Sequence, residues 1–254
     1  MTISKEVWKN YINGLDKVDA TVKQLVMKYI ETHDIEAEGG RDALIEYCYG
    51  LAVKYGEAAA EFACQFYDAI SELEGADVDP AEPAEPASYD EVAKTINGTL
   101  KYVMYLEIAS AAIGRLVKQT GQDTTLRNAI RDRAFYAWIP SGDTCAFCLS
   151  IAAEGWKRAT AKALAGGHAD HIHGNCNCAY SIKHNKETVY SSYDPEEYQE
   201  IMSHAEGKTK EDKINSIRRM FYDENSAKIR AQKRNEYEIH KELESSEAEE
   251  IDVN

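Results

Sequence analysis

The most informative segment of the chain begins with Trp138-Ile-Pro-Ser-Gly-Asp-Thr-Cys145-Ala-Phe-Cys148 and closes with His173-Gly-Asn-Cys176-Asn-Cys178. It contains four of the six cysteines of the chain. Zinc prefers four thiolate or imidazole ligands in a tetrahedral arrangement, and tight turns supply such ligands two at a time. The spacing therefore predicts a small metal-binding module in which a structural zinc ion ties two segments of the chain together.

Five side chains compete for the four positions of this metal site: Cys145, Cys148, His173, Cys176 and Cys178. The first two form a Cys-x2-Cys half-site, because a turn of two residues lets both sulfur atoms point the same way. Cys176 and Cys178 are so close in the sequence that they would crowd a single ion. Either one of them therefore does not bind the metal, or both bind and His173 does not. The reserve ligands are His168, His171 and His184. The remaining alternative is four free cysteines in a loop, with disulfides expected only outside the cell.

A closed four-ligand site leaves no position for a reactive water, so we do not expect an enzyme. Zinc deaminases place a His-x-Glu before a Pro-Cys-x2-Cys, whereas Thr144 precedes the first cysteine here. His-Asn-His nucleases offer a nearer parallel, because Asp170-His171-Ile172 resembles part of their metal-bound hairpin. However, Cys176 follows too closely to leave room for the hairpin and helix of that family. A metal-dependent nuclease using His171 is kept as an alternative.

The net charge of −15 over 254 residues is unevenly distributed. Residues 1–90 carry 7 basic and 19 acidic side chains, residues 91–193 carry 12 and 8, and residues 194–254 carry 10 and 17. Acidic flanks repel phosphate backbones, so a nucleic-acid contact would be confined to the middle segment. They predict solvated helix faces or contact with a basic protein. We see no membrane span and no secretory signal, and therefore expect synthesis in a reducing cytosol.

Hydrophobic periodicity predicts long helices before the module. Apolar residues recur every three or four positions at Leu15, Val18, Val22 and Leu25, a spacing that places them on one helical face. A longer helix is expected from about Asp42 to Leu73. Prolines at positions 80, 83 and 86 then forbid a helix and favour an extended linker.

The capping-box spacing of Ser88 and Glu91 predicts the start of a new helix. We expect this helix to reach about Lys118 and to stop at Gly121. A short helix should follow over residues 124–133. An extended stretch and a turn then lead to the first cysteine pair.

Later helices are expected over residues 149–165, from Pro195 onward, and over residues 209–243. The fold class is therefore mainly α. Its expected parts are an N-terminal helical region (1–74), a Pro/Ala/Glu linker (75–87), a helical region (88–136), a small zinc-knot α+β module (137–185), charged C-terminal helices (194–245) and an acidic disordered tail (246–254).

The segments 138–155 and 173–178 together resemble the MuF-like minor head proteins of tailed bacteriophages. The signature of that family is a Gly-Asp-x-Cys-x-x-Cys segment, a short apolar helix ending near glycine, and a later His-x2-Cys-x-Cys. The match covers roughly residues 125–185. The family often has His-Pro or His-Asp, and an arginine between the last cysteines, where this chain has Gly174 and Asn177.

The resemblance implies a structural minor capsid protein of a tailed phage or prophage that acts in head assembly or in DNA packaging and ejection. Its expected partners are the portal and the major capsid or scaffold proteins, with contact to packaged DNA. No membrane and no small-molecule substrate is expected. It would reside in the virion, in the capsid interior or at the portal vertex, and in the host cytoplasm during assembly. A capsid maturation protease is a further alternative, although no Gly-x-Ser-x-Gly is present.

Overall fold

Helices dominate the structure, a computed structural model that describes residues 1–100, 105–142, 144–162 and 176–222. The predicted fold class, mainly α with a small sheet beside a cysteine cluster, is confirmed. The chain divides into two compact units, Met1–Gln199 and Glu200–Asn254. The predicted acidic tail and the later part of the predicted 209–243 helix lie outside the described residues.

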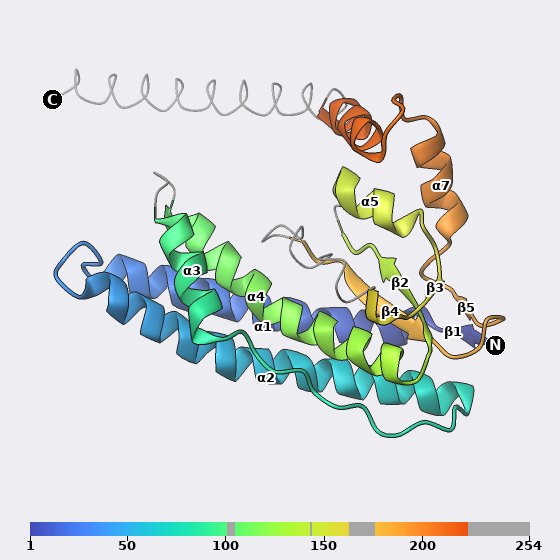
Figure 1. Cartoon of the computed structure of the whole chain (residues 1–254), viewed down its shortest axis with the longest axis horizontal. Coiled ribbons are helices and arrows are strands. Elements are labelled where there is room, and N and C mark those ends of the chain that lie inside the picture. The colour runs from blue at the N-terminus through green and yellow to red at the C-terminus, as the bar shows by residue number, and fades with distance from the viewer. Residues whose placement is uncertain (101–104, 143, 163–175, 223–254) are drawn as a thin grey trace, which may run out of the picture. The chain divides into compact units, whose positions relative to one another are not determined.

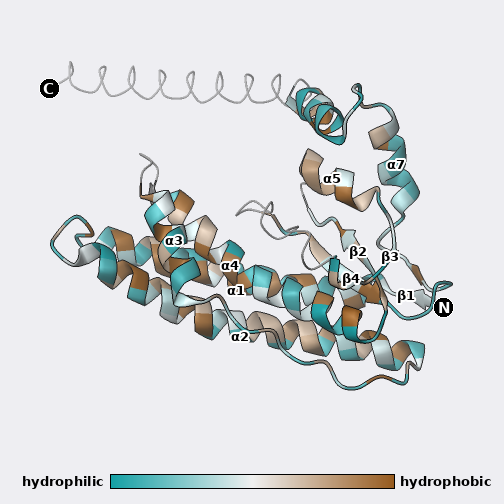
Figure 2. Ribbon diagram, viewed as in Figure 1, coloured by the Kyte–Doolittle hydropathy of each residue, from teal (hydrophilic) through white to brown (hydrophobic). Residues whose placement is uncertain are grey.

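Three long helices form the body of the first unit: α1 (Lys5–Thr32), α2 (Gly40–Glu74) and α4 (Tyr105–Arg131). They lie side by side in Figure 1, and each is in contact with the other two. The predicted stripe of α1 faces this interface, where Val22 is fully buried and Leu25 packs against the core. Figure 2 shows apolar and polar residues mixed along each helix, as expected for helices that bury one face only.

An extended strap, residues 75–87, follows α2 and runs beside it (Figure 1). Gly75 ends α2 in the left-handed conformation (φ 62°), which glycine adopts without steric cost. Side chains of α4 then hold the strap: Asn128 pairs with both backbone groups of Glu82, and Thr124 accepts from the N–H of Ala84. The proline-rich segment is therefore fastened to the helices by side-chain hydrogen bonds.

The predicted capping box is confirmed at the start of α3 (Tyr89–Thr99), where Ser88 and Glu91 bond reciprocally. The predicted helix ends were wrong. Instead of one helix that stops at Gly121 and a short one over 124–133, α3 ends early and α4 continues through Gly121. A Cβ at position 121 would lie 3.0 Å from the carbonyl oxygen of Ala59 on α2. Glycine is therefore required there for close helix packing and does not end the helix.

A three-stranded antiparallel sheet lies at one end of the helices. Its central strand is β2 (Phe135–Ile139), flanked by β3 (Lys157–Arg158) and β4 (Ala179–Lys183). Trp138 of β2 packs edge-on against its cross-strand partner Tyr180, at 4.8 Å between ring centroids. Both rings are buried and belong to the same hydrophobic core as the helices.

The prediction of one helix over residues 149–165 was wrong for residues 153–160, and its last part, 163–165, lies outside the described residues. Instead, α5 (Ala146–Ala152) ends after two turns, Gly155 adopts a left-handed φ of 69°, and the chain returns as β3. The local apolar pattern favoured a helix, but the backbone of Lys157 and Arg158 pairs with the start of β2. Tertiary pairing therefore overrides local helix propensity in this segment.

Short elements complete the first unit and begin the second. β1 (Thr2–Ile3) pairs in parallel with β5 (Val189–Tyr190), which fastens the start of the chain to the segment after the sheet. α7 (Pro195–Ser203) begins at the predicted proline. In the second unit, residues 210–222 are helical, and Thr209 and Asp212 bond reciprocally at the start of that helix. None of the described helices combines the length and apolarity needed to cross a bilayer.

Candidate metal centre

The register of the sheet brings the two cysteine pairs to the same place. Antiparallel pairing sets Ile139, the last residue of β2, opposite Ala179, the first residue of β4. Cys178 immediately precedes β4, and the first cysteine pair follows β2 after a turn in which Gly142 has a φ of 64°. Segments far apart in the sequence therefore meet at one end of the sheet.

The first cysteine pair lies at the beginning of α5. Cys145 is the N-cap residue, and its Sγ accepts a hydrogen bond from the backbone N–H of Cys148 at 3.5 Å. A sulfur atom that receives a backbone N–H at a helix N-terminus is placed where negative charge is stabilised. Cys148 follows one turn later and is fully buried. The helical turn thus places the two residues of the Cys-x2-Cys pair next to each other.

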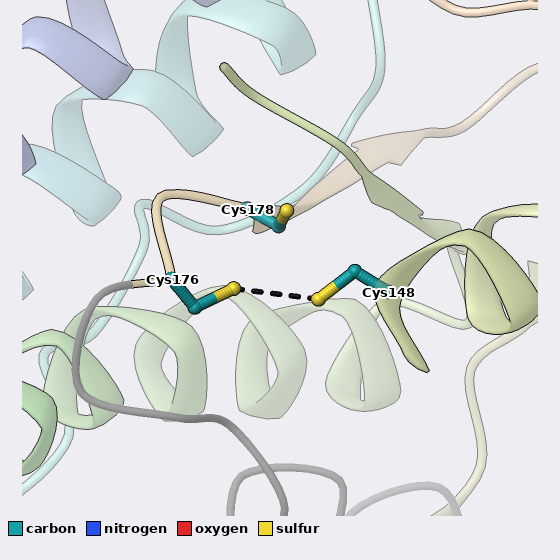
Figure 3. Close-up of side chains that lie close together, drawn as sticks. All are labelled: Cys148, Cys176 and Cys178. Carbon is teal, nitrogen blue, oxygen red and sulfur yellow. Dashed lines mark hydrogen bonds between the residues drawn. The ribbon is translucent and has the colours of Figure 1, made fainter. Parts of the chain in front are cut away.

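Three of the five predicted ligands converge in a cysteine cluster, which consists of Cys148, Cys176 and Cys178. Their Sγ atoms all lie within 4.8 Å of one another, and all three residues are buried. Figure 3 shows the sulfur atoms of Cys148 and Cys176 directed toward each other, 3.3 Å apart, from α5 and from the segment leading into β4. The described residues contain no other group of this kind.

The separations within the cluster suit one tetrahedral metal ion. Four sulfur atoms at about 2.3 Å from a zinc ion lie about 3.8 Å from one another. The Sγ atoms of Cys148 and Cys176 are 3.3 Å apart, and all three sulfur atoms lie within 4.8 Å of one another, which is close enough for one ion to contact them together. Both Cys176 and Cys178 belong to the cluster, so neither is turned away from it.

The candidates for a fourth ligand are Cys145 and His173. Cys145 is partly exposed and lies beside Cys148. His173 lies outside the described residues, as do the reserve ligands His168 and His171. Three soft thiolates and one of these two side chains would form a closed site of the kind that stabilises a fold.

Mutual hydrogen bonding and burial disfavour the charged forms of these thiols. The pKa of Cys148 is raised far above its usual range by hydrogen bonds with Cys145, Cys176 and Cys178 and by burial. For Cys178, the hydrogen bond with Cys148 lowers the pKa, but the hydrogen bond with Cys176 and burial outweigh it and raise the pKa to about 12. A bound divalent cation inverts this balance, because a coordinated thiol loses its proton. The cluster is therefore chemically suited to a cation.

The third reserve ligand, His184, has a different contact. Its Nε2 lies 2.9 Å from the hydroxyl of Ser71 on α2, and its ring packs edge-on against Tyr67. The Ser71 hydroxyl is buried and also bonds to the carbonyl oxygen of Tyr67, one turn earlier in α2. This serine–histidine contact joins α2 to the end of β4.

Sequence reasoning missed two residues near the cluster, Asp19 and Lys118. The Lys118 Nζ lies 2.5 Å from the carbonyl oxygen of Cys176 and 3.3 Å from Oδ2 of Asp19. A signal was present for Asp19, because it lies on the apolar face of α1 together with Leu15 and Val22. A charged residue on such a face needs a partner.

The fold and the site define a mainly helical protein with a small sheet and a buried thiol cluster that could hold a metal ion. A comparison with protein-family models matches residues 2–205 to the family described as VG15 protein. The chain therefore belongs to the VG15 family and is a viral protein, whose role the family match leaves unspecified. Comparisons with curated proteins and with solved structures found no match.

Proposed function

We propose that this protein is a structural minor capsid protein of a tailed phage or prophage, acting in head assembly or in DNA packaging and ejection. Membership of a viral family supports this proposal, together with the resemblance of residues 138–178 to the MuF-like head proteins. On this proposal the protein is not an enzyme. It would act in the virion, inside the capsid or at the portal vertex.

The observation that carries the proposal is the burial of three thiols within 4.8 Å of one another. With Cys145 or His173 as the fourth ligand, they would hold a structural zinc ion. The ion would cross-link α5 to the start of β4. With four protein ligands it would have no open coordination position for a reaction. Such a cross-link would stabilise the end of the sheet where α5 meets β4, which suits a protein built into a particle.

The charge distribution supports protein partners for the helices. Residues 1–90, which include α1 and α2, carry 7 basic and 19 acidic side chains. Acidic surfaces fit basic protein partners and repel DNA. We propose that these helices contact the portal or the major capsid and scaffold proteins. Contact with packaged DNA would be limited to the segment 91–193, which carries 12 basic and 8 acidic side chains.

Elemental analysis with thiol titration tests the metal centre. The purified protein should contain about one zinc per chain, and the cluster thiols should react only after chelation or denaturation. The two cysteines of α2, Cys48 and Cys64, are buried and should not respond to the chelator alone. Purified protein that contains no metal, and whose cluster thiols react fully without chelation, would contradict the proposed metal centre.

Particle assembly tests the proposed role. The chain is co-expressed with the capsid, scaffold and portal proteins of the same virus, and procapsids are purified by sedimentation. We expect few copies of the chain in complete procapsids and none in particles assembled without the portal protein. Absence of the chain from complete procapsids would contradict the proposal.

The two enzymatic alternatives make different predictions. A nuclease would nick supercoiled plasmid DNA with magnesium and lose this activity in His171→Ala. A maturation protease would shorten capsid or scaffold protein during co-expression. Ser71 and His184 are in contact, but the serine hydroxyl is buried and bonded to a backbone carbonyl. This arrangement does not present a nucleophile to a substrate.

A further inference from the structure

A buried lysine contacts the backbone of the cysteine cluster. Lys118, on α4, is 6% exposed. Its Nζ donates a hydrogen bond of 2.5 Å to the carbonyl oxygen of Cys176. It also lies 3.3 Å from Oδ2 of Asp19 on α1. The ammonium group therefore bridges the helices and the segment that carries two of the three cluster thiols.

The carboxylate of Asp19 is more closely paired with a different lysine. Lys23 lies one turn along α1 and bonds Oδ2 of Asp19 at 2.7 Å. Lys118 makes the longer contact with the same oxygen atom and its shorter contact with Cys176. A second carboxylate of α1 lies near both lysines: burial raises the pKa of Asp16, and the nearby charges of Lys118 and Lys23 oppose this rise. The ammonium group of Lys118, which bonds the Cys176 carbonyl, places positive charge next to the cysteine cluster.

A metal–thiolate centre needs such a charge. A divalent ion with four thiolates carries a net charge of −2, and one with three thiolates and a neutral histidine carries −1. Burying a net charge is costly unless an opposite charge lies close by. The cluster residues Cys148, Cys176 and Cys178 are all buried, so solvent screens the centre only weakly.

We propose that Lys118 is the counter-cation and positioning residue of the metal centre. Its hydrogen bond holds the Cys176 carbonyl, which orients the ligand segment, and its charge offsets that of the bound thiolates. This inference rests on the proposed metal centre. Metal affinity would then depend on the packing of α1 against α4, because Asp19 and Lys118 come from these two helices.

Packing of α1 on α4 fixes this arrangement. A Cβ at Gly114, one turn before Lys118, would lie 2.2 Å from Oδ1 of Asp19. The carboxylate of Asp19 therefore lies directly against the α4 backbone, where only glycine leaves room. This contact places the carboxylate beside Lys118 and directs the ammonium group toward the cluster.

The test compares Lys118→Met with a matched control, Lys183→Met. Lys183 is also 6% exposed and also donates to backbone carbonyls, those of Lys186 and Thr188. It lies at the opposite end of β4 from Cys178. Zinc affinity of the full chain is measured by competition with a chromogenic chelator, and the absorption spectrum of the cobalt-substituted protein reports the ligand set.

We expect Lys118→Met to weaken zinc binding about 10- to 100-fold, the usual cost of losing an outer-shell partner. The cobalt spectrum should keep its thiolate charge-transfer bands. Lys183→Met should bind zinc within about twofold of wild type. Equal affinities for Lys118→Met and wild type would overturn the inference, as would equal losses in both variants.

A second variant, Lys118→Gln, controls for misfolding of Lys118→Met. Lys118→Gln removes the charge but keeps an amide donor for the Cys176 carbonyl. We expect it to lose at least about tenfold in zinc affinity as well. Wild-type affinity in Lys118→Gln would overturn the counter-cation role.

Melting temperatures with and without zinc separate this role from a purely structural one. A structural lysine lowers the stability of both forms equally, whereas a counter-cation lowers that of the zinc-bound form more. Equal losses would overturn the inference. If wild-type protein itself binds no metal, the proposed centre fails. If wild-type protein binds metal and both Lys118 variants match it, the inference alone fails.

Discussion

Cys148 contacts two other cysteines of the candidate centre. Its Sγ lies 3.3 Å from that of Cys176, and its backbone N–H bonds the sulfur of Cys145. Because it is fully buried, no other side chain can take its place without moving the start of α5. Loss of this one thiol should therefore remove the metal.

We predict that Cys148→Ser contains no zinc and melts at the same temperature as chelated wild-type protein. Chelation should not lower the melting temperature of the variant any further. Cys64→Ser is the control, because Cys64 is a buried cysteine of α2, and it should retain the metal. A Cys148→Ser variant that keeps one zinc per chain would show that this thiol is not a ligand.

His184 makes stability depend on pH. Burial lowers the pKa of this half-buried imidazole below the usual 6.5, against the opposing charges of Glu74 and Asp132. Below pH 6.5 the unfolded chain takes up a proton before the folded one does. The contribution of His184 is therefore complete above this pH and is lost as the pH falls toward the lower folded-state pKa.

We predict that urea midpoints of the chelated protein decline from pH 7 to pH 5, and that His184→Gln reduces this decline. Chelation before the titration removes any effect of metal release at low pH. An identical pH profile for variant and wild type would contradict the assignment.

At the scale of single elements, capping decides where α3 begins. The Ser88 side chain accepts from the N–H of Glu91, and the Glu91 carboxylate accepts from the N–H of Ser88. We predict that Ser88→Ala lowers the free energy of unfolding by about 0.5–2 kcal/mol in chemical denaturation. Ser88→Asp keeps an acceptor at this position and should cost little. Equal losses in the free energy of unfolding for Ser88→Ala and Ser88→Asp would argue against the capping role of this side chain.

The contact of α1 with α4 depends on the absence of a side chain at position 114. Gly114→Ala would bring Cβ to 2.2 Å from the Asp19 carboxylate, so the helices must separate. We predict a loss of about 1–3 kcal/mol in the free energy of unfolding. Gly50→Ala is the matched control: this exposed position of α2 has nothing within 4 Å of the added Cβ. It should gain roughly 0.5–1 kcal/mol. An unchanged free energy of unfolding in Gly114→Ala would contradict the close contact of α1 with α4.

At the scale of the whole molecule, the helices and the sheet belong to one compact unit, Met1–Gln199. Gln122 of α4 accepts from the backbone N–H of Tyr180 in β4, and Lys118 contacts Cys176. Unfolding of the sheet should therefore be coupled to unfolding of the helices, so that both melt together.

We predict that chelation lowers one common melting transition. Circular dichroism follows the helices, and fluorescence of a Trp8→Phe variant, which retains Trp138 and Trp156, follows the sheet. Both signals should shift by the same amount when the metal is removed. Two transitions, of which only the fluorescence signal shifts, would instead indicate an independent metal-binding module.

Local patterns in the sequence determined the helical class, the stripe of α1, the capping box at Ser88 and the Cys-x2-Cys pair. These features depend on residues three or four positions apart, so the sequence displays them directly. Tertiary structure alone decided that α4 continues through Gly121 and that α5 ends early. It also set the sheet register that brings Cys148 to Cys176 and the contact of Lys118 with the cluster. The reason is physical: the role of a glycine depends on the backbone packed against it, and a buried charge depends on partners distant in the chain.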